Sequence, residues 1–175
     1  MYYTRNSDLN YYNSHRCRAN CGSYALRLNE WYDPEGYLEK LEGDIYDWVE
    51  QMAMNGYDDY DISNYYISIL TEGMLNEFGD ELELCDGRAP DTSDKELIAF
   101  NGFATCDDDY NIDVDFHFKV LRDGHWSEKQ GMEAVKFCEL EDWGRYIGEP
   151  VYMYHKINME GTNDDTKSNT CNSAD

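Results

Sequence analysis

The 175-residue chain carries 14 basic and 37 acidic residues, a formal net charge of -23 at pH 7. A surface of that charge repels nucleic acid and anionic membranes and attracts a basic protein partner. Hydrophobic residues make up 41% of the chain and aromatic residues 15%, which is typical of one packed globular domain and excludes a disordered chain. Acidity of this kind also keeps a chain soluble, whatever its function.

No apolar run approaches the roughly 18 residues that a membrane-spanning helix needs. The first residues lack the apolar core of a signal peptide. We therefore expect a cytoplasmic protein, in the host cytoplasm if it is phage-encoded, with mostly free thiols. Of the six cysteines only Cys17 and Cys21 are close in sequence, and no second pair or histidine couple completes a zinc site. We expect neither a metal nor a cofactor.

The first half of the chain is predicted to form three helices after a polar lead-in. Their apolar residues recur at spacings of three and four, and turn residues or a glycine follow each helix. Asn20 and Ser23 can cap the first of them. The predicted helices cover residues 21 to about 31, 37–55 and about 63–78.

The second half is predicted to form strands, because the pattern after Gly79 changes to alternation with period two. The predicted strands cover residues 81–85, 97–106, 114–121, 135–140 and 151–157. Helices followed by strands indicate an α+β fold, with N-terminal helices packed on a C-terminal antiparallel sheet. We expect a single domain over residues 1–158 and a disordered polar tail over 159–175.

Cys21 and His117 are the residues that point to chemistry. Unpaired N–H groups and the helix dipole at a helix start favour the thiolate of Cys21. His117 lies in a predicted strand, and its face is shared with Asp115 and Lys119. A thiol at a helix start and an imidazole on a strand are two parts of a cysteine hydrolase, in which the imidazole takes the thiol proton and the thiolate attacks a carbonyl. A lone cysteine is otherwise a small buried hydrophobe.

Two blocks of the sequence resemble a papain-like family found in bacteria, phages and shell-matrix proteins. Its members carry an Asn-Cys-x-x-Tyr-Ala-Leu helix start, and later Asp-x-His-Phe-Tyr-Arg, a short turn and Trp-Ser-His-Lys-Pro-Gly. The first block here is Asn20–Leu26, and the second consists of Asp115–Val120, a turn and Trp126–Gly131. The resemblance implies a papain-like fold, with Cys21 as the nucleophile and His117 as its base.

Three positions depart from the family pattern. Lys119 replaces a tyrosine, Glu128 a histidine and Gln130 a proline. Papain-like enzymes orient the histidine with a third polar residue on a following strand. The candidates for that role here are Glu128, Ser127 and Asp115, and Glu128 completes the predicted catalytic set.

The acidic surface supports a function of another class. Carboxylates can take the place of phosphates against lysine and arginine, and so exclude a nucleic acid from its channel. The first hypothesis is therefore an anti-CRISPR-like phage or mobile-element inhibitor on a papain-like fold, which mimics nucleic acid and binds a basic nucleic-acid-binding protein. Its predicted contact residues are Asp44, Asp47, Asp58, Asp59, Asp61, Tyr57 and Tyr60. The alternative hypothesis is a cysteine peptidase or amidase that uses Cys21 and His117 on a substrate of basic character.

Overall fold

Helices occupy the first half of the chain and strands the second. The computed structural model describes residues 8, 10–85, 87 and 92–157, so the predicted tail over 159–175 lies outside the described residues. The helices are α1 (Tyr11–Ser14), α2 (Cys21–Ala25), α3 (Gly36–Glu42), α4 (Ile45–Met54) and α5 (Asp59–Phe78), followed by a 3-10 turn, η1 (Gly79–Glu81). The strands are β1 (Leu82–Leu84), β2 (Lys95–Cys106), β3 (Ile112–Arg122), β4 (His125–Glu128), β5 (Lys136–Phe137) and β6 (Val151–Lys156).

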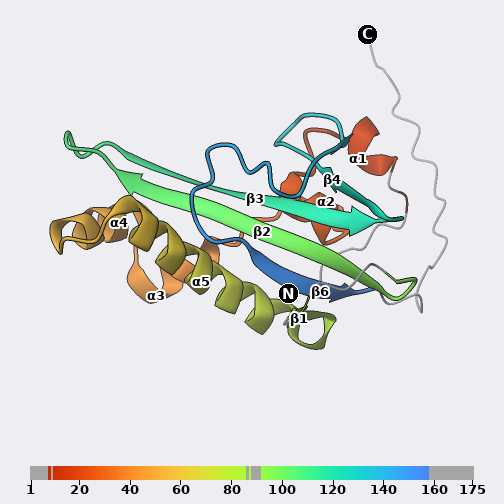
Figure 1. Cartoon of the computed structure of the whole chain (residues 1–175), viewed down its shortest axis with the longest axis horizontal. Coiled ribbons are helices and arrows are strands. Elements are labelled where there is room, and N and C mark those ends of the chain that lie inside the picture. Colours follow the sequence, from red (N-terminus) through yellow and green to blue (C-terminus); the bar gives the residue numbers. More distant parts are fainter. Residues whose placement is uncertain (1–7, 9, 86, 88–91, 158–175) are drawn as a thin grey trace, which may run out of the picture.

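The strands form one antiparallel sheet in the order β1-β6-β2-β3-β4-β5. β2 and β3 pair from Leu97↔Leu121 to Cys106↔Ile112 and form the long central hairpin in Figure 1. β4 pairs only with the second half of β3, from Lys119↔Glu128 to Arg122↔His125. Among the described residues, the first half of β3 therefore has no strand partner on that side, and we call this its free edge.

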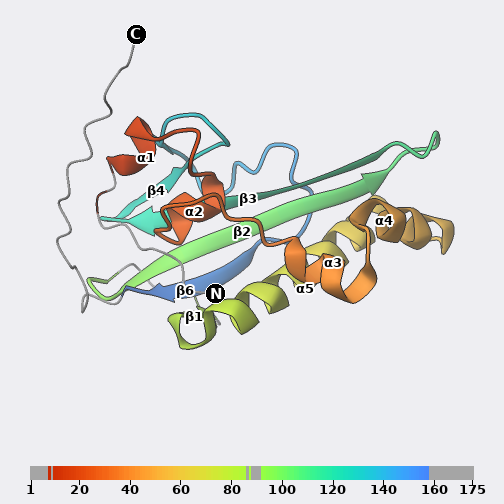
Figure 2. The same ribbon diagram turned by 180° about the vertical axis from the view of Figure 1, so that it is seen from behind.

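The helices cover one face of this sheet. Figures 1 and 2 show α5 running along β2, with α3 and α4 on the same side. Ile67 and Leu70 of α5 belong to the same core as Phe100 and Phe118 of the sheet, and each is at most 2% exposed. The chain between β5 and β6 crosses the other face (Figure 1). The predicted α+β class, with N-terminal helices on an antiparallel sheet, is confirmed.

The helix predicted over 37–55 is wrong in one respect, because the chain forms two helices there. Gly43 has a φ of 87°, a conformation that ends α3 and that side chains disfavour. Asp44 then caps α4, since its carboxylate accepts hydrogen bonds from the N–H groups of Tyr46 (2.9 Å) and Asp47 (3.3 Å). Asp58 caps α5 in the same way, so that this helix starts earlier than predicted.

The first predicted helix is also too long, because α2 ends at Ala25 and not near Trp31. Arg27 has a left-handed φ of 56°. The guanidinium of Arg122 donates hydrogen bonds to the last helical carbonyls, those of Tyr24 (2.8 Å) and Ala25 (2.9 Å). The strand predicted over 135–140 is likewise reduced to the two residues of β5, since the chain leaves the sheet there.

Within the described residues, no helix combines the length and the apolar character needed to cross a bilayer. The same part of the chain contains no group of three or more histidine, cysteine or carboxylate side chains arranged to hold a metal ion.

Candidate functional site

Cys21 reaches the sheet at the free edge of β3. Its thiol donates a long hydrogen bond to the carbonyl oxygen of Phe116, with a sulfur–oxygen distance of 4.0 Å. Gly22 makes this approach feasible, because a Cβ at that position would lie 2.8 Å from the Tyr32 ring and 3.2 Å from the Phe118 ring. The start of α2 therefore packs directly on β3, and a side chain at position 22 would press on the rings of Tyr32 and Phe118.

Asn20 fixes the backbone from which Cys21 projects. Its Oδ1 accepts a hydrogen bond from the N–H of Ser23 (3.0 Å), and the Ser23 hydroxyl accepts one from the N–H of Asn20 (3.3 Å). The Asn20 amide also donates to the carbonyl of Tyr32 (2.6 Å). This buried network holds the helix start, where the first N–H groups have no intrahelical partners.

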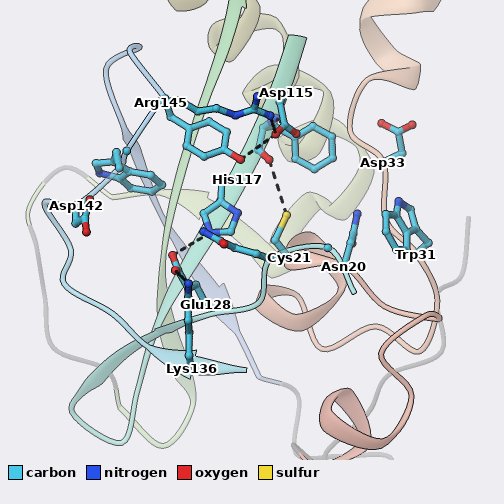
Figure 3. A pocket seen from close by; sticks show the side chains of 16 residues that line it. Asn20, Cys21, Trp31, Asp33, Asp115, His117, Glu128, Lys136, Asp142 and Arg145 are labelled. Atoms are coloured by element: carbon cyan, nitrogen blue, oxygen red, sulfur yellow. Dashed lines mark hydrogen bonds and ion pairs between the residues drawn. The ribbon is translucent and has the colours of Figure 1, made fainter. Parts of the chain in front are cut away.

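His117 lies between Cys21 and Glu128, as Figure 3 shows. Its Nε2 is 3.0 Å from Oε2 of Glu128, and the side chains of both residues are buried. Because Nε2 faces the carboxylate, Nδ1 is the ring nitrogen turned toward Cys21 in Figure 3. Lys136 holds the other oxygen of Glu128 at 3.2 Å. The imidazole is thus placed to exchange a proton with the thiol while the carboxylate orients it.

A buried lysine holds the loop that covers His117. Lys119 is 1% exposed, and its ammonium donates to the carbonyls of Glu139 (2.6 Å) and Asp142 (2.5 Å). It also lies 4.6 Å from the centre of the Trp143 ring. The next aromatic residue of the loop, Tyr146, stacks on His117 with a centroid distance of 5.4 Å and an interplanar angle of 18°. Lys119 therefore positions the wall of the site.

These groups share one cleft of about 660 Å³ between α2, β3 and the loop. The lining residues are Asn20, Cys21, Trp31, Asp33, Asp115, Phe116, His117, Glu128, Gln130, Gly131, Lys136, Asp142, Trp143, Gly144, Arg145 and Tyr146. The three residues predicted as catalytic, Cys21, His117 and Glu128, come together in it.

The two acidic groups that flank the imidazole have opposite pKa shifts. Burial raises the pKa of the Cys21 thiol to about 12, and the negative charge of Asp115 adds to the rise. Burial also opposes ionisation of Glu128, but the hydrogen bond and charge of His117 outweigh it and hold the pKa of that carboxyl below its usual value. At neutral pH the resting site therefore holds a thiol and a carboxylate. The expectation that the helix start favours the thiolate is wrong for the resting site, because burial outweighs the N–H groups there.

The acidic residues predicted as contacts lie along α4 and the first turns of α5. These five aspartates and the two tyrosines predicted with them are all exposed, and three of the seven line a hollow. Tyr57, Asp58 and Asp59 line a second hollow of about 410 Å³, together with Asp107 and Asp108 of the β2–β3 turn. Asp44 and Asp47 lie at the far end of α4, and Asp61 and Tyr60 lie outside the lining of the hollow.

Several of these residues also have local structural roles. Asp44 and Asp58 are helix caps. Asp59 accepts a hydrogen bond from the N–H of Cys106 (3.1 Å), and the Tyr60 hydroxyl donates one to Glu149 (2.6 Å). The predicted set is therefore partly a set of residues that shape the helix starts.

Sequence reasoning missed much of the cleft wall. Trp31 lies shortly after the cysteine block, and Asp33 is the first residue of the turn sequence Asp-Pro-Glu-Gly at 33–36, which is a usable signal. Residues 142–146, in contrast, lie in a loop without periodicity, and only their contacts with β3 place them at the site.

Comparison with known proteins finds no family model, curated protein or solved structure that matches this chain.

Proposed function

We propose that this protein is a cysteine hydrolase with a papain-like fold and arrangement of groups, which cleaves a peptide or amide. The observation that carries the proposal is the position of His117, whose ring lies between the Cys21 sulfur and the Glu128 carboxylate in one cleft (Figure 3). Burial of these three residues supports it, because surface residues of these types would be solvated and need no partner.

In the proposed reaction, Nδ1 of His117 takes the proton of the Cys21 thiol, and the sulfur attacks the substrate carbonyl carbon. The negative charge that develops on the carbonyl oxygen is stabilised by the N–H of Cys21 at the start of α2. The imidazolium then returns its proton to the leaving amine, which gives a thioester. A water molecule that loses its proton to His117 hydrolyses the thioester and restores the thiol.

The high pKa of the Cys21 thiol is compatible with this sequence of steps. A thiolate forms in the cleft only when the proton moves to His117, so that both charges appear together as an ion pair. Glu128 stabilises the imidazolium half of that pair, as a triad carboxylate does.

The test is acylation by an activated ester. Incubation with p-nitrophenyl acetate should release a burst of p-nitrophenol and then turn over, with the acetyl group on the tryptic peptide that contains Cys21. Cys17 is exposed and lies on a separate tryptic peptide, so it serves as the reference thiol in the same sample. Equal acetylation of Cys17 and Cys21, or a Cys21→Ala variant that retains the burst, would contradict the proposal.

The second candidate is the acidic inhibitor, a protein that acts in the cytoplasm on a basic nucleic-acid-binding partner. The hollow beside α5 favours it, because four carboxylates and two exposed tyrosines, Tyr57 and Tyr110, lie around it. Its lining contains no lysine, arginine or histidine among the described residues. Such a surface presents carboxylates and aromatic faces to a basic protein, as a nucleic acid presents phosphates and bases.

This candidate predicts a salt-sensitive complex that does not depend on the thiol. The Cys21→Ala variant should capture a basic nucleic-acid-binding protein at 0.1 M salt and release it at 0.5 M salt. Neutralising Asp58, Asp59 and Asp61 together to asparagine should abolish the capture, since asparagine keeps the cap and removes the charge. Unchanged capture by that triple variant would exclude this surface as the contact.

A further inference from the structure

The catalytic cleft carries uncompensated negative charge. Four carboxylates line it, and two of them are neutralised by the two cations of the lining: Lys136 lies 3.2 Å from Glu128, and Arg145 lies 2.6 Å from Asp115. For the other two carboxylates, Asp33 and Asp142, no ion pair is found with any described lysine, arginine or histidine. Asp33 and Asp142 therefore leave two negative charges of the cleft uncompensated by the described residues.

Asp33 is the better placed of the two to bind a ligand. One of its oxygens accepts a hydrogen bond from the N–H of Glu35 (2.9 Å), which holds the side chain of this exposed residue in place. Trp31 lies beside it on the side of Cys21 away from His117, and half of the indole surface is exposed (Figure 3). A carboxylate and a half-exposed indole that line the same part of a cleft attract an ammonium or guanidinium group by charge and by cation–π contact.

We propose that Trp31 and Asp33 form a subsite for a cationic side chain, and that the preferred substrate carries a lysine- or arginine-like group next to the scissile carbonyl. This inference rests on the proposed hydrolase. A substrate bound in this way lies across Cys21, with its cation at Trp31 and Asp33 and its carbonyl over the thiol. The net charge of -23 steers such a substrate toward the protein, while the subsite selects where its cation binds.

Charged thiol reagents test the subsite without a known substrate. Aminoethyl methanethiosulfonate is cationic and sulfonatoethyl methanethiosulfonate is anionic, and the ratio of their rates at one thiol reports the charge that surrounds it. Mass spectrometry of tryptic peptides gives this ratio separately for Cys21 and for the exposed Cys17, which reports the general field of the protein. We expect the ratio at Cys21 to exceed that at Cys17 several-fold.

Substitution assigns the effect to Asp33. Asp33→Asn should lower the Cys21 ratio by about fivefold, the upper range for an exposed charge pair, and leave the Cys17 ratio unchanged. Asp123→Asn is the matched control, because it removes the same charge from the exposed turn at the end of β3. Trp31→Leu should lower the ratio as well, since leucine keeps the apolar surface and loses the indole face.

A second readout uses acylation of Cys21 by p-nitrophenyl esters of Nα-acetyl-lysine and Nα-acetyl-norleucine, which differ by the ammonium group. The lysine ester should react faster with the unmodified protein, and Asp33→Asn should remove the difference.

The outcomes separate the two proposals. If Cys21 is acylated but Asp33→Asn behaves like Asp123→Asn, the subsite is wrong and the hydrolase stands. If Asp142→Asn abolishes the preference and Asp33→Asn does not, the assignment to Asp33 is overturned. If neither ester acylates Cys21 faster than Cys17, the hydrolase fails, and the reagent ratio still reports whether a cation site is present.

Discussion

Replacing Glu96 with alanine is expected to lower the free energy of unfolding by about 3–5 kcal/mol, a large part of the total for a domain of this size. Glu96 is 2% exposed. Its carboxylate lies 3.0 Å from Nη2 of Arg122, which is 6% exposed, and 2.8 Å from Nη2 of Arg27. The substitution would leave the buried guanidinium of Arg122 without its counter-charge, and that desolvated charge is the source of the cost.

The effect should extend to the site, because Arg122 also binds the carbonyls at the end of α2. Loss of Glu96 therefore loosens the helix that carries Cys21. Urea denaturation measures the loss of stability. Glu83→Ala is the control, since Glu83 pairs with Lys95 at 2.7 Å at a partly exposed edge of the sheet, and we expect it to cost under about 1 kcal/mol. If Glu96→Ala and Glu83→Ala lowered the free energy of unfolding equally, burial of the ion pair would not be the source of the large effect.

The same carboxylate predicts a dependence on pH. Burial would raise the pKa of Glu96, but the contact with His155 and the charge of Arg122 hold it far below its ordinary value. The folded state therefore stays unprotonated where the unfolded chain, with a glutamate pKa of about 4.3, takes up a proton. This contribution is complete above that pH and is lost as the pH falls toward the folded pKa. Below about pH 4, Glu96→Gln should therefore approach the unmodified protein in stability.

Periodicity was sufficient for the element types and the layer order, because both depend on local patterns of apolar residues. It missed the break at Gly43 and the early end of α2. A left-handed glycine and a cap from Asp44 interrupt a hydrophobic stripe that continues across them. The end of α2 depends on Arg122, which is 97 residues away in sequence from Ala25.

The buried tyrosines show a second feature that amino-acid composition does not predict. Tyr12 and Tyr66 are fully buried, and each hydroxyl has an acceptor: the carbonyl of Leu28 for Tyr12 and the carboxylate of Glu35 for Tyr66. The high tyrosine content predicts a packed chain, but it does not predict which hydroxyls are paired, because the partners come from other elements.

Cys21, His117 and Glu128 could be proposed from the sequence because two short blocks place them. Their surroundings could not, since they depend on the loop that Lys119 holds across the sheet. A lysine next to a histidine on a strand face would ordinarily point to solvent. Here three backbone carbonyls accept hydrogen bonds from its ammonium group, and no local sequence pattern predicts such partners.

Replacing His117 with alanine is expected to slow alkylation of Cys21 by iodoacetamide about 100-fold or more at pH 7. Burial raises the pKa of the Cys21 thiol in the folded protein to about 12, so that only about one molecule in 10⁵ carries a preformed thiolate at that pH. Without His117 the reaction depends on that small fraction. With His117 present the imidazole accepts the proton as the sulfur attacks, so that the reaction does not need a preformed thiolate.

The pH profile distinguishes this mechanism from a change in access. In the unmodified protein the rate should approach a plateau near neutral pH, whereas in His117→Ala it should rise about tenfold per pH unit up to pH 10, as for an isolated thiol. Glu128→Gln should lie between the two, because the amide retains a hydrogen bond to Nε2 and loses the charge that favours the imidazolium. His125→Ala is the matched control, since His125 is exposed on β4. Alanine at position 117 also widens the cleft, and easier access alone would speed alkylation at every pH. A loss of rate at neutral pH that disappears toward pH 12 therefore reports the missing proton acceptor and not a change in access.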